Sequence, residues 1–148
     1  GELFHRVCVV TPNLDEAALL LGHDIAGIGD LDGAANELLA LGTPAVLLKG
    51  GHLPGSVVVD VLAMRDGTRQ RLQSPRIPSR NVHGTGCTLS SAIAAQLALG
   101  LALPQAVAEA RRYILAAISA GAQVQTGRGH GPLNHGHAPL PMRLLPID

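Results

Sequence analysis

Aromatic side chains are almost absent from this sequence, whose 148 residues include one Phe, one Tyr and no Trp. Proteins that bind single-stranded nucleic acid usually stack bases on aromatic rings, so no base-stacking surface is expected. An excess of charge of either sign is also lacking, because eleven acidic side chains balance eleven basic ones. The chain therefore has no broad electrostatic footprint for nucleic acid or for a membrane surface, and its core must be aliphatic.

Cysteine is scarce, and long apolar runs are missing. The two cysteines, Cys8 and Cys87, form neither a disulfide framework nor a CxxC pair. No apolar run approaches the length of about 20 residues that spans a bilayer, and the first residues lack the layout of a signal peptide. We therefore expect a cytoplasmic protein, with Cys8 in the core as part of a buried strand over residues 7–10.

The two common glycine-rich nucleotide fingerprints are absent as well. No glycine loop is followed by Lys and then Ser or Thr at the Walker spacing, and no GxGxxG opens a helix after a strand. The remaining candidate for phosphate binding is a glycine-paired turn at residues 81–87, NVHGTGC, ahead of a predicted helix over residues 88–99. If the chain handles phosphate, we expect it to do so there.

This glycine turn combines an anion cradle with a thiol. Gly84 and Gly86 allow backbone conformations closed to other residues and let a ligand approach the amides closely. The first turn of the following helix offers unpaired N–H groups and the positive end of the helix dipole, and Cys87 lies at that end, where a thiol ionises more readily. The pattern favours transfer of a charged group. The same pattern is also compatible with a loop that only caps a helix and has no ligand, the helix being buried on nearly all sides.

Several candidate residues have more than one interpretation. Cys87 could be a small buried hydrophobe, a nucleophile beside His83, or a general base that takes a proton from a substrate hydroxyl while the amides hold a phosphoryl group. Asn13 and Glu16, at the start of a predicted helix, have the spacing of a capping box. Lys49, at the end of an apolar strand, either binds phosphate as a point charge or is simply solvated.

Apolar runs and helical patterns alternate along the chain. Strands are predicted over residues 7–10, 45–48, 57–63 and 68–73, and helices over residues 13–21, 31–41, 88–99 and 104–121. This alternation predicts one α/β domain over residues 1–148, with a mostly parallel sheet, flanking helices and one antiparallel hairpin at Asp66-Gly67. Ligands gather at the carboxyl ends of parallel strands, so residues 11–13, 49–52 and 81–87 should converge on one cleft.

The last part of the chain, residues 123–148, is rich in Gly, Pro and His and carries little periodicity. We predict an irregular tail there. His130, His135 and His137 invite interpretation as a metal site, but no Cys lies near them and Gly and Pro residues surround them. A mobile tail is therefore the expected structure.

Four stretches together resemble the hydroxymethylpyrimidine/phosphomethylpyrimidine kinases of thiamine biosynthesis, a branch of the ribokinase-like superfamily. They are TPNLDEAALLLG at residues 11–22, LLKGGH at 47–52, NVHGTGCTLSSAIAA at 81–95 and GRGHGPLNHGH at 127–137, in the family's order and spacing. The resemblance covers most of the chain and corresponds to the C-terminal half of a family member. It therefore implies the C-terminal half of a ribokinase-like fold.

The resemblance implies phosphoryl transfer from Mg-ATP to a primary hydroxyl. By position, Gly84, Thr85 and Gly86, with the amide of Cys87, would form an anion hole around the γ-phosphate. Cys87 stands where most ribokinase-like enzymes carry an Asp base, and it would serve as the general base. Such a reaction depends on positioning and charge neutralisation more than on covalent chemistry.

The resemblance also assigns the nucleotide side of the site. Asn13 and Glu16 match the superfamily's N-x-x-E element, which would organise Mg²⁺ and the phosphates indirectly. Lys49, Gly50 and Gly51 match residues that line the nucleotide. ATP and Mg²⁺ are thus the implied cofactors, and a small pyrimidine alcohol is the implied substrate.

The expected function is phosphorylation of hydroxymethylpyrimidine and its monophosphate, with this chain as a truncated C-terminal portion of the kinase. A pyridoxal kinase is the enzyme alternative, because related kinases share the glycine turn. A non-catalytic interaction module is the alternative of another class. Such a module would pair with itself or with a missing N-terminal half.

Overall fold

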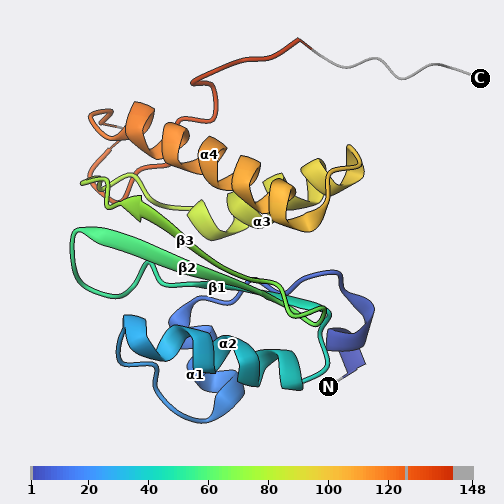
Figure 1. Ribbon diagram of the computed structural model, residues 1–148. Coiled ribbons are helices and arrows are strands. Elements are labelled where there is room, and N and C mark those ends of the chain that lie inside the picture. The colour runs from blue at the N-terminus through green and yellow to red at the C-terminus, as the bar shows by residue number, and fades with distance from the viewer. Residues whose placement is uncertain (1, 126, 142–148) are drawn as a thin grey trace, which may run out of the picture. The chain divides into compact units, whose positions relative to one another are not determined.

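The computed structural model describes residues 2–125 and 127–141 and divides into two compact units, Gly1–Arg76 and Ile77–Asp148. The expectation of one domain over residues 1–148 stays a prediction. In chain order, the first unit contains the 3₁₀ helix η1 (Glu2–Arg6), α1 (Leu14–Leu21), the 3₁₀ helix η2 (Ile28–Asp30), α2 (Leu31–Ala40), β1 (Ala45–Lys49), β2 (Val57–Met64) and β3 (Arg69–Pro75) (Figure 1). The second unit contains α3 (Thr85–Ala98) and α4 (Leu103–Gly121). The α/β class is confirmed.

The sheet of the first unit has the strand order β1-β2-β3, and both strand pairs are antiparallel. The expected mostly parallel pairing is therefore wrong for the described chain. The connection of β1 to β2 consists of residues 50–56 alone, which is shorter than the crossover of about a dozen residues that a parallel neighbour needs. The β2–β3 hairpin forms at Asp66-Gly67 as predicted, with Gly67 at a φ of 94°.

In the described part of the first unit, parallel pairing involves only the segment that precedes α1. Val10 forms a parallel bridge with Val46, and Asn13 forms one with Lys49. The chain leaves this segment through α1 and α2 before it returns as β1, and this connection is long enough for parallel neighbours. The parallel arrangement expected from the alternating pattern is thus present, but only along one edge of β1.

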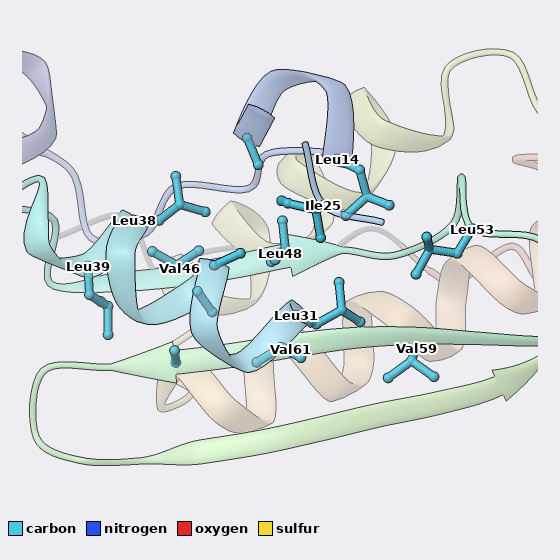
Figure 2. Close-up of a cluster of buried hydrophobic side chains, with 14 residues drawn as sticks. Leu14, Ile25, Leu31, Leu38, Leu39, Val46, Leu48, Leu53, Val59 and Val61 are labelled. Atoms are coloured by element: carbon cyan, nitrogen blue, oxygen red, sulfur yellow. The ribbon is translucent and has the colours of Figure 1, made fainter. Parts of the chain in front are cut away.

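One face of the sheet packs against α1 and α2, which lie on the same side of it (Figure 1). Strand residues alternate between faces, so Val46 and Leu48 of β1 share this face with Val59, Val61 and Ala63 of β2. Figure 2 shows how leucine and valine side chains from these strands meet those of the helices. The core is aliphatic, as the lack of aromatic residues predicts. Its members are Leu14, Ala17, Ile25, Leu31, Ala34, Ala35, Leu38, Leu39, Val46, Leu48, Leu53, Val59, Val61 and Ala63.

The predicted buried strand over residues 7–10 is largely wrong. Only Val10 pairs with the sheet, and η1 stands before it where a strand was expected almost at once. Cys8 is exposed rather than part of the core. The reason is that the described residues place no second strand beside residues 7–9, so these apolar side chains lack a complete pleated surface to pack on.

In the second unit, α3 packs against α4, and Pro104 occupies the first turn of α4 as predicted. The expectation that the first of these helices is buried nearly all round is wrong, since only Leu89 and Ile93 of α3 are buried. Alanine accounts for much of this difference, because its small side chain fits equally well on an exposed and a buried helix face. Within the described part of the chain, no helix is long and apolar enough to cross a membrane.

The described residues after α4 form neither helix nor strand, yet part of this segment is held in place. The amide of His83 donates to Gly131 O at 3.3 Å, and the amide of Asn134 donates to Ala117 O at 3.2 Å. Leu133 between them is buried. This anchoring does not fit the expected mobile tail, and residues 142–148 lie outside the described part.

Candidate functional site

The glycine turn is the start of helix α3 itself. Gly84 is the N-cap, with φ at 83°, a left-handed conformation that glycine adopts without steric cost. The helix begins at Thr85, three positions before the predicted start at residue 88. Gly86 and Cys87 therefore belong to the first helical turn, where backbone N–H groups have no acceptor within the helix. The expected anion cradle is consequently part of a helix end rather than a loop before it.

Hydrogen bonds at this helix end decide which donors remain for a ligand. The hydroxyl of Thr85 donates to Val82 O at 2.6 Å, and its amide approaches the same carbonyl at 3.3 Å. The hydroxyl of Thr88 donates to Gly84 O at 2.8 Å. The amides of Gly86 and Cys87 are thus better placed to meet an anion than any group of Thr85. The Cys87 side chain is exposed, which excludes its interpretation as a buried hydrophobe.

His83 does not form the partner that a cysteine nucleophile needs. Its amide bonds to Gly131 O, and its backbone forms a parallel bridge with Pro132. Among the described residues, no hydrogen bond joins the His83 ring to Cys87. The geometry thus gives no support to a Cys–His pair for nucleophilic catalysis.

Asn81 is a residue of this motif whose role sequence reasoning missed. Its side chain is buried, and its amide nitrogen donates to Gly121 O at 2.7 Å and to Val124 O at 2.6 Å. Both acceptors lie at the carboxyl end of α4, where backbone carbonyls lack helical partners. Asn81 therefore fixes the chain that leads into the glycine turn. The sequence carries no signal for this role, because the burial of Asn81 and its contacts with residues 40 or more positions away depend on the fold.

On the first unit, Asn13 and Glu16 form the predicted capping box of α1. The amide of Glu16 donates to Asn13 Oδ1 at 2.8 Å, and the amide of Asn13 donates to Glu16 Oε2 at 2.8 Å. This reciprocal pair satisfies donors of the first helical turn. Because one carboxylate oxygen of Glu16 is engaged in the cap, any role of this pair toward a cation would run through the remaining oxygen or through water.

Lys49 lies directly beside Asn13. The two residues form a parallel bridge, and the amide of Lys49 donates to Pro12 O at 3.0 Å. Lys49 is half-buried and is the only lysine of the sequence. The structure thus brings Asn13 and Lys49 together at the end of β1, as expected for residues 11–13 and 49–52, and Glu16 joins them through its capping bonds to Asn13. The glycine turn belongs to the other unit, so the expectation that all of these residues share one cleft stays a prediction.

The two glycines after Lys49 have different environments. A Cβ at Gly50 would lie 2.0 Å from the backbone oxygen of Val59, and the Gly50 amide already donates to the buried carboxylate of Asp60 at 2.9 Å. A Cβ at Gly51 would meet no heavy atom within 4 Å. Glycine at position 50 is therefore required by packing, whereas glycine at position 51 faces open space. Of these two glycines, only Gly51 is not explained by packing within the fold.

Two residues outside the predicted site hold the loop that follows Lys49. His52 Nδ1 lies 3.0 Å from Asp15 Oδ2, which links the loop to the first turn of α1. Arg76, just after β3, donates to backbone carbonyls of the same loop. Neither contact could be found from spacing, because both join residues that are far apart in the sequence.

Two histidines of the C-terminal segment, His135 and His137, contact the Tyr113 side chain or a backbone carbonyl. Tyr113 Oη lies 3.3 Å from His135 Nδ1, and its ring centroid lies 5.1 Å from that of His137. His137 Nδ1 lies 3.1 Å from Asn134 O. Across residues 2–125 and 127–141, no group of three or more His, Cys, Asp or Glu side chains is arranged to hold a metal ion.

Comparison with known proteins assigns the family. Residues 1–134 match the family model described as phosphomethylpyrimidine kinase. The chain is 49% identical over 137 residues to the hydroxymethylpyrimidine/phosphomethylpyrimidine kinase of Rhizobium meliloti, covering 92% of this chain and 51% of that protein. The chain belongs to the phosphomethylpyrimidine kinase family. The resemblance read from the four sequence stretches is confirmed.

Solved structures support the same fold for this phosphomethylpyrimidine kinase family member. The ADP complex of a Bacillus subtilis pyridoxal kinase matches with a TM-score of 0.83 at 35% identity, over 91% of this chain and 50% of that one. A phosphomethylpyrimidine kinase from Clostridium difficile 630 matches with a TM-score of 0.65 at 37% identity, over 78% of this chain and 45% of that one. This chain thus spans about half the length of these relatives, which are kinases.

Proposed function

We propose that this chain carries the phosphate-binding and proton-accepting portion of an ATP-dependent kinase that phosphorylates hydroxymethylpyrimidine and its monophosphate. The observation that carries the proposal is the start of α3, where the left-handed Gly84 brings two free amides and the exposed thiol of Cys87 onto one helix end. The 49% identity to a kinase of that name supports the choice of substrate class.

The amides of Gly86 and Cys87, at the positive end of α3, would hold the γ-phosphate and stabilise charge as it develops on the transferring phosphoryl group. The sulfur of Cys87 takes the proton of the substrate's primary hydroxyl. The hydroxyl oxygen then forms its bond to γ-phosphorus, and the bond from γ-phosphorus to the bridging oxygen breaks to leave ADP. Gly84 and Thr85 contribute by shaping the turn rather than by donating to the phosphate.

The nucleotide side of the proposal rests on the Asn13, Glu16 and Lys49 group. Lys49 is half-buried, and among the described residues no acceptor is bonded to its ammonium group, so its charge is available to phosphate oxygens. The free carboxylate oxygen of Glu16 fits an outer position near a hydrated cation, in keeping with the indirect role expected for it. A bound Mg²⁺ would neutralise charge on the phosphates.

The test compares Cys87→Ala with Cys87→Ser in a complete enzyme that joins this chain to the N-terminal half of a relative. Because Cys87 is exposed, neither change should alter thermal stability. Loss of the proton acceptor should reduce turnover by about 10²-fold or more in the alanine variant, with the KM for ATP nearly unchanged. Near-normal turnover of Cys87→Ala would remove Cys87 as the base.

The second enzyme candidate is a pyridoxal kinase, and the structural comparison gives a reason to test this activity. The Bacillus subtilis pyridoxal kinase matches this fold with a higher TM-score than the Clostridium difficile phosphomethylpyrimidine kinase does. Rates measured side by side on hydroxymethylpyrimidine and pyridoxal separate the two. A kcat/KM that is at least tenfold higher for pyridoxal would overturn the pyrimidine assignment.

A pairing module is the candidate from another class, and the incompletely buried apolar segment around Cys8 favours testing it. Residues 7–9 pair with no strand among the described residues, so they could accept a strand from a second copy or from an N-terminal half. A concentration-dependent oligomer together with the absence of any thermal shift in Mg-ATP would support the module. A thermal shift in Mg-ATP would support the kinase portion.

A further inference from the structure

One side chain, that of Arg76, binds several backbone carbonyls of the loop between β1 and β2, residues 50–56. The guanidinium of Arg76 donates from Nε to Gly55 O at 2.7 Å, from Nη1 to Gly51 O at 2.9 Å and from Nη2 to Leu53 O. The Arg76 amide also donates to Ser56 O at 2.7 Å. Arg76 thus binds the backbone of the loop at four residues.

The carbonyls that Arg76 binds belong to alternate residues of the loop, so three oxygen atoms converge on one cation. A guanidinium suits this arrangement because its N–H groups lie in one plane and point in fixed directions. A lysine ammonium carries the same charge on a single nitrogen and cannot reach three carbonyls spread along a loop. The geometry therefore requires the shape of arginine and not only its charge.

Other contacts hold the opposite side of the loop. The Gly50 amide binds Asp60, the Leu53 side chain is part of the aliphatic core (Figure 2), and His52 contacts Asp15 on α1. Gly51 lies among these fixed points, and the space where its Cβ would stand is open. The loop is therefore held on each side of Gly51, where the backbone leaves room for a ligand to approach. Gly55 also borders open space, but its φ of 117° already gives this glycine a role in the turn.

We propose that Arg76 is a positioning residue that holds residues 50–56, and Gly51 in particular, in the conformation that receives the phosphate-bearing ligand. The inference rests on the proposed function, since it is that function which makes the loop part of a nucleotide site. Arg76 acts through the backbone of the loop and does not touch the ligand. A loop released from Arg76 would have to be ordered again on binding, which weakens affinity.

The test uses the 148-residue chain with three variants. Arg76→Lys keeps the charge, Arg76→Gln removes it, and Arg71→Lys is the matched control, because Arg71 binds the side chain of Asp32 instead of the loop. The readouts are the dissociation constant for Mg-ATP by isothermal titration and amide hydrogen exchange over residues 50–56. Both Arg76 variants should bind Mg-ATP about tenfold more weakly and exchange faster in the loop, with the control unchanged.

Each outcome bears on the proposal separately from the proposed function. If Mg-ATP binds the parent chain and Arg76→Lys binds it equally well, charge alone is sufficient and the inference is wrong. If loop exchange is unchanged in both Arg76 variants, Arg76 does not hold the loop and the inference is again wrong. If the parent chain does not bind Mg-ATP while Arg76→Gln still loosens the loop, the proposed function fails and the anchoring of the loop by Arg76 stands.

Discussion

Gly50 and Gly51 are adjacent in the sequence but have different environments in the structure. Gly50 packs against the backbone oxygen of Val59 and gives its amide to Asp60, whereas Gly51 borders open space. Both lie in the stretch LLKGGH that carried the family resemblance, and the sequence alone assigned both to nucleotide binding. The structure gives Gly50 a role in the fold and leaves Gly51 as the better candidate for contact with a ligand.

Alanine substitutions should separate these roles. Gly50→Ala places a Cβ against a backbone atom that cannot move aside, so the free energy of unfolding should fall by about 1–3 kcal/mol. Gly51→Ala should change it by less than about 0.5 kcal/mol. Urea denaturation of the two variants beside the parent chain measures this. Equal stability of the two variants would contradict the assigned difference.

His23 provides a prediction about pH. Its Nε2 lies 2.9 Å from Glu37 Oε2, and this hydrogen bond, with a smaller contribution from the Asp24 carbonyl, raises the pKa of His23 above 6.5. A raised folded-state pKa means that the stabilisation by this pair is fully present below pH 6.5 and is lost as the pH rises through the folded-state value.

An NMR titration of the His23 ring should therefore give a midpoint above 6.5 in the parent chain. Glu37→Gln should bring the midpoint back toward that value, because it removes the negative partner. Glu109→Gln is the control, since Glu109 pairs with Arg112. A midpoint that does not respond to Glu37→Gln would show that the contact is absent in solution.

At the scale of single residues, the sequence predicted contacts between neighbours and missed those between distant positions. The capping box of Asn13 and Glu16 follows from their spacing, because a capping box is a local structure. Arg76 and the carbonyl of Gly51 are 25 positions apart, and only the tertiary fold brings them together. The exposure of Cys8 was missed for a similar reason, since burial of a strand depends on its neighbours in space.

Among the elements, α3 depends on a contact that lies before its first turn. Asn81 donates to the carbonyls of Gly121 and Val124 and so ties the approach to α3 to the end of α4. Within the described part of the chain, the side-chain nitrogen of Asn81 forms hydrogen bonds with these two carbonyls alone. The placement of the glycine turn therefore rests in part on one buried amide.

Asn81→Leu should remove the side-chain donor of both carbonyls, which leaves Gly121 O with the Val124 amide alone. Loss of the pair should lower the free energy of unfolding by about 2–4 kcal/mol. Asn36→Ala is the control, because Asn36 is exposed and binds Arg69 at the surface, and it should cost less than about 1 kcal/mol. Chemical denaturation followed by circular dichroism reports both values. A cost for Asn81→Leu no larger than that of the control would mean that water satisfies the carbonyls.

The ends of helices were predicted correctly where a Gly or Pro marks one clear boundary and were missed where two glycines leave the boundary ambiguous. Gly22 ends α1 in a left-handed conformation, and Pro104 opens α4, both as expected. The start of α3 was placed too late because two glycines within three positions are poor helix formers. One of them proved to be the cap and the other a residue of the first turn.

At the scale of the whole molecule, the predicted alternation of strands and helices is replaced by groups, with α1 and α2 first, then β1, β2 and β3, then α3 and α4. The strands joined by short connections are antiparallel, and the parallel bridges to β1 occur where α1 and α2 intervene. The connection lengths were readable from the sequence and would have corrected the pairing. The arrangement of the two compact units could not be read in the same way, since no local pattern encodes it.

The family of the chain and its half-length match indicate which part of a kinase site the chain would supply. It belongs to the phosphomethylpyrimidine kinase family and spans about half of the relatives it matches. Its two site portions, the Asn13, Glu16 and Lys49 group and the start of α3, lie in separate compact units. We expect the Asn13, Glu16 and Lys49 group to contact the phosphates of ATP.

The sole lysine of the sequence allows this claim to be measured directly. An amine-reactive reagent can modify only Lys49 and the chain's α-amino group, and mass spectrometry separates the two products. Mg-ATP in the micromolar to millimolar range should slow modification of Lys49 in a saturable manner, whereas Mg²⁺ with adenosine should not. Modification of Lys49 at the same rate with and without Mg-ATP would contradict the account.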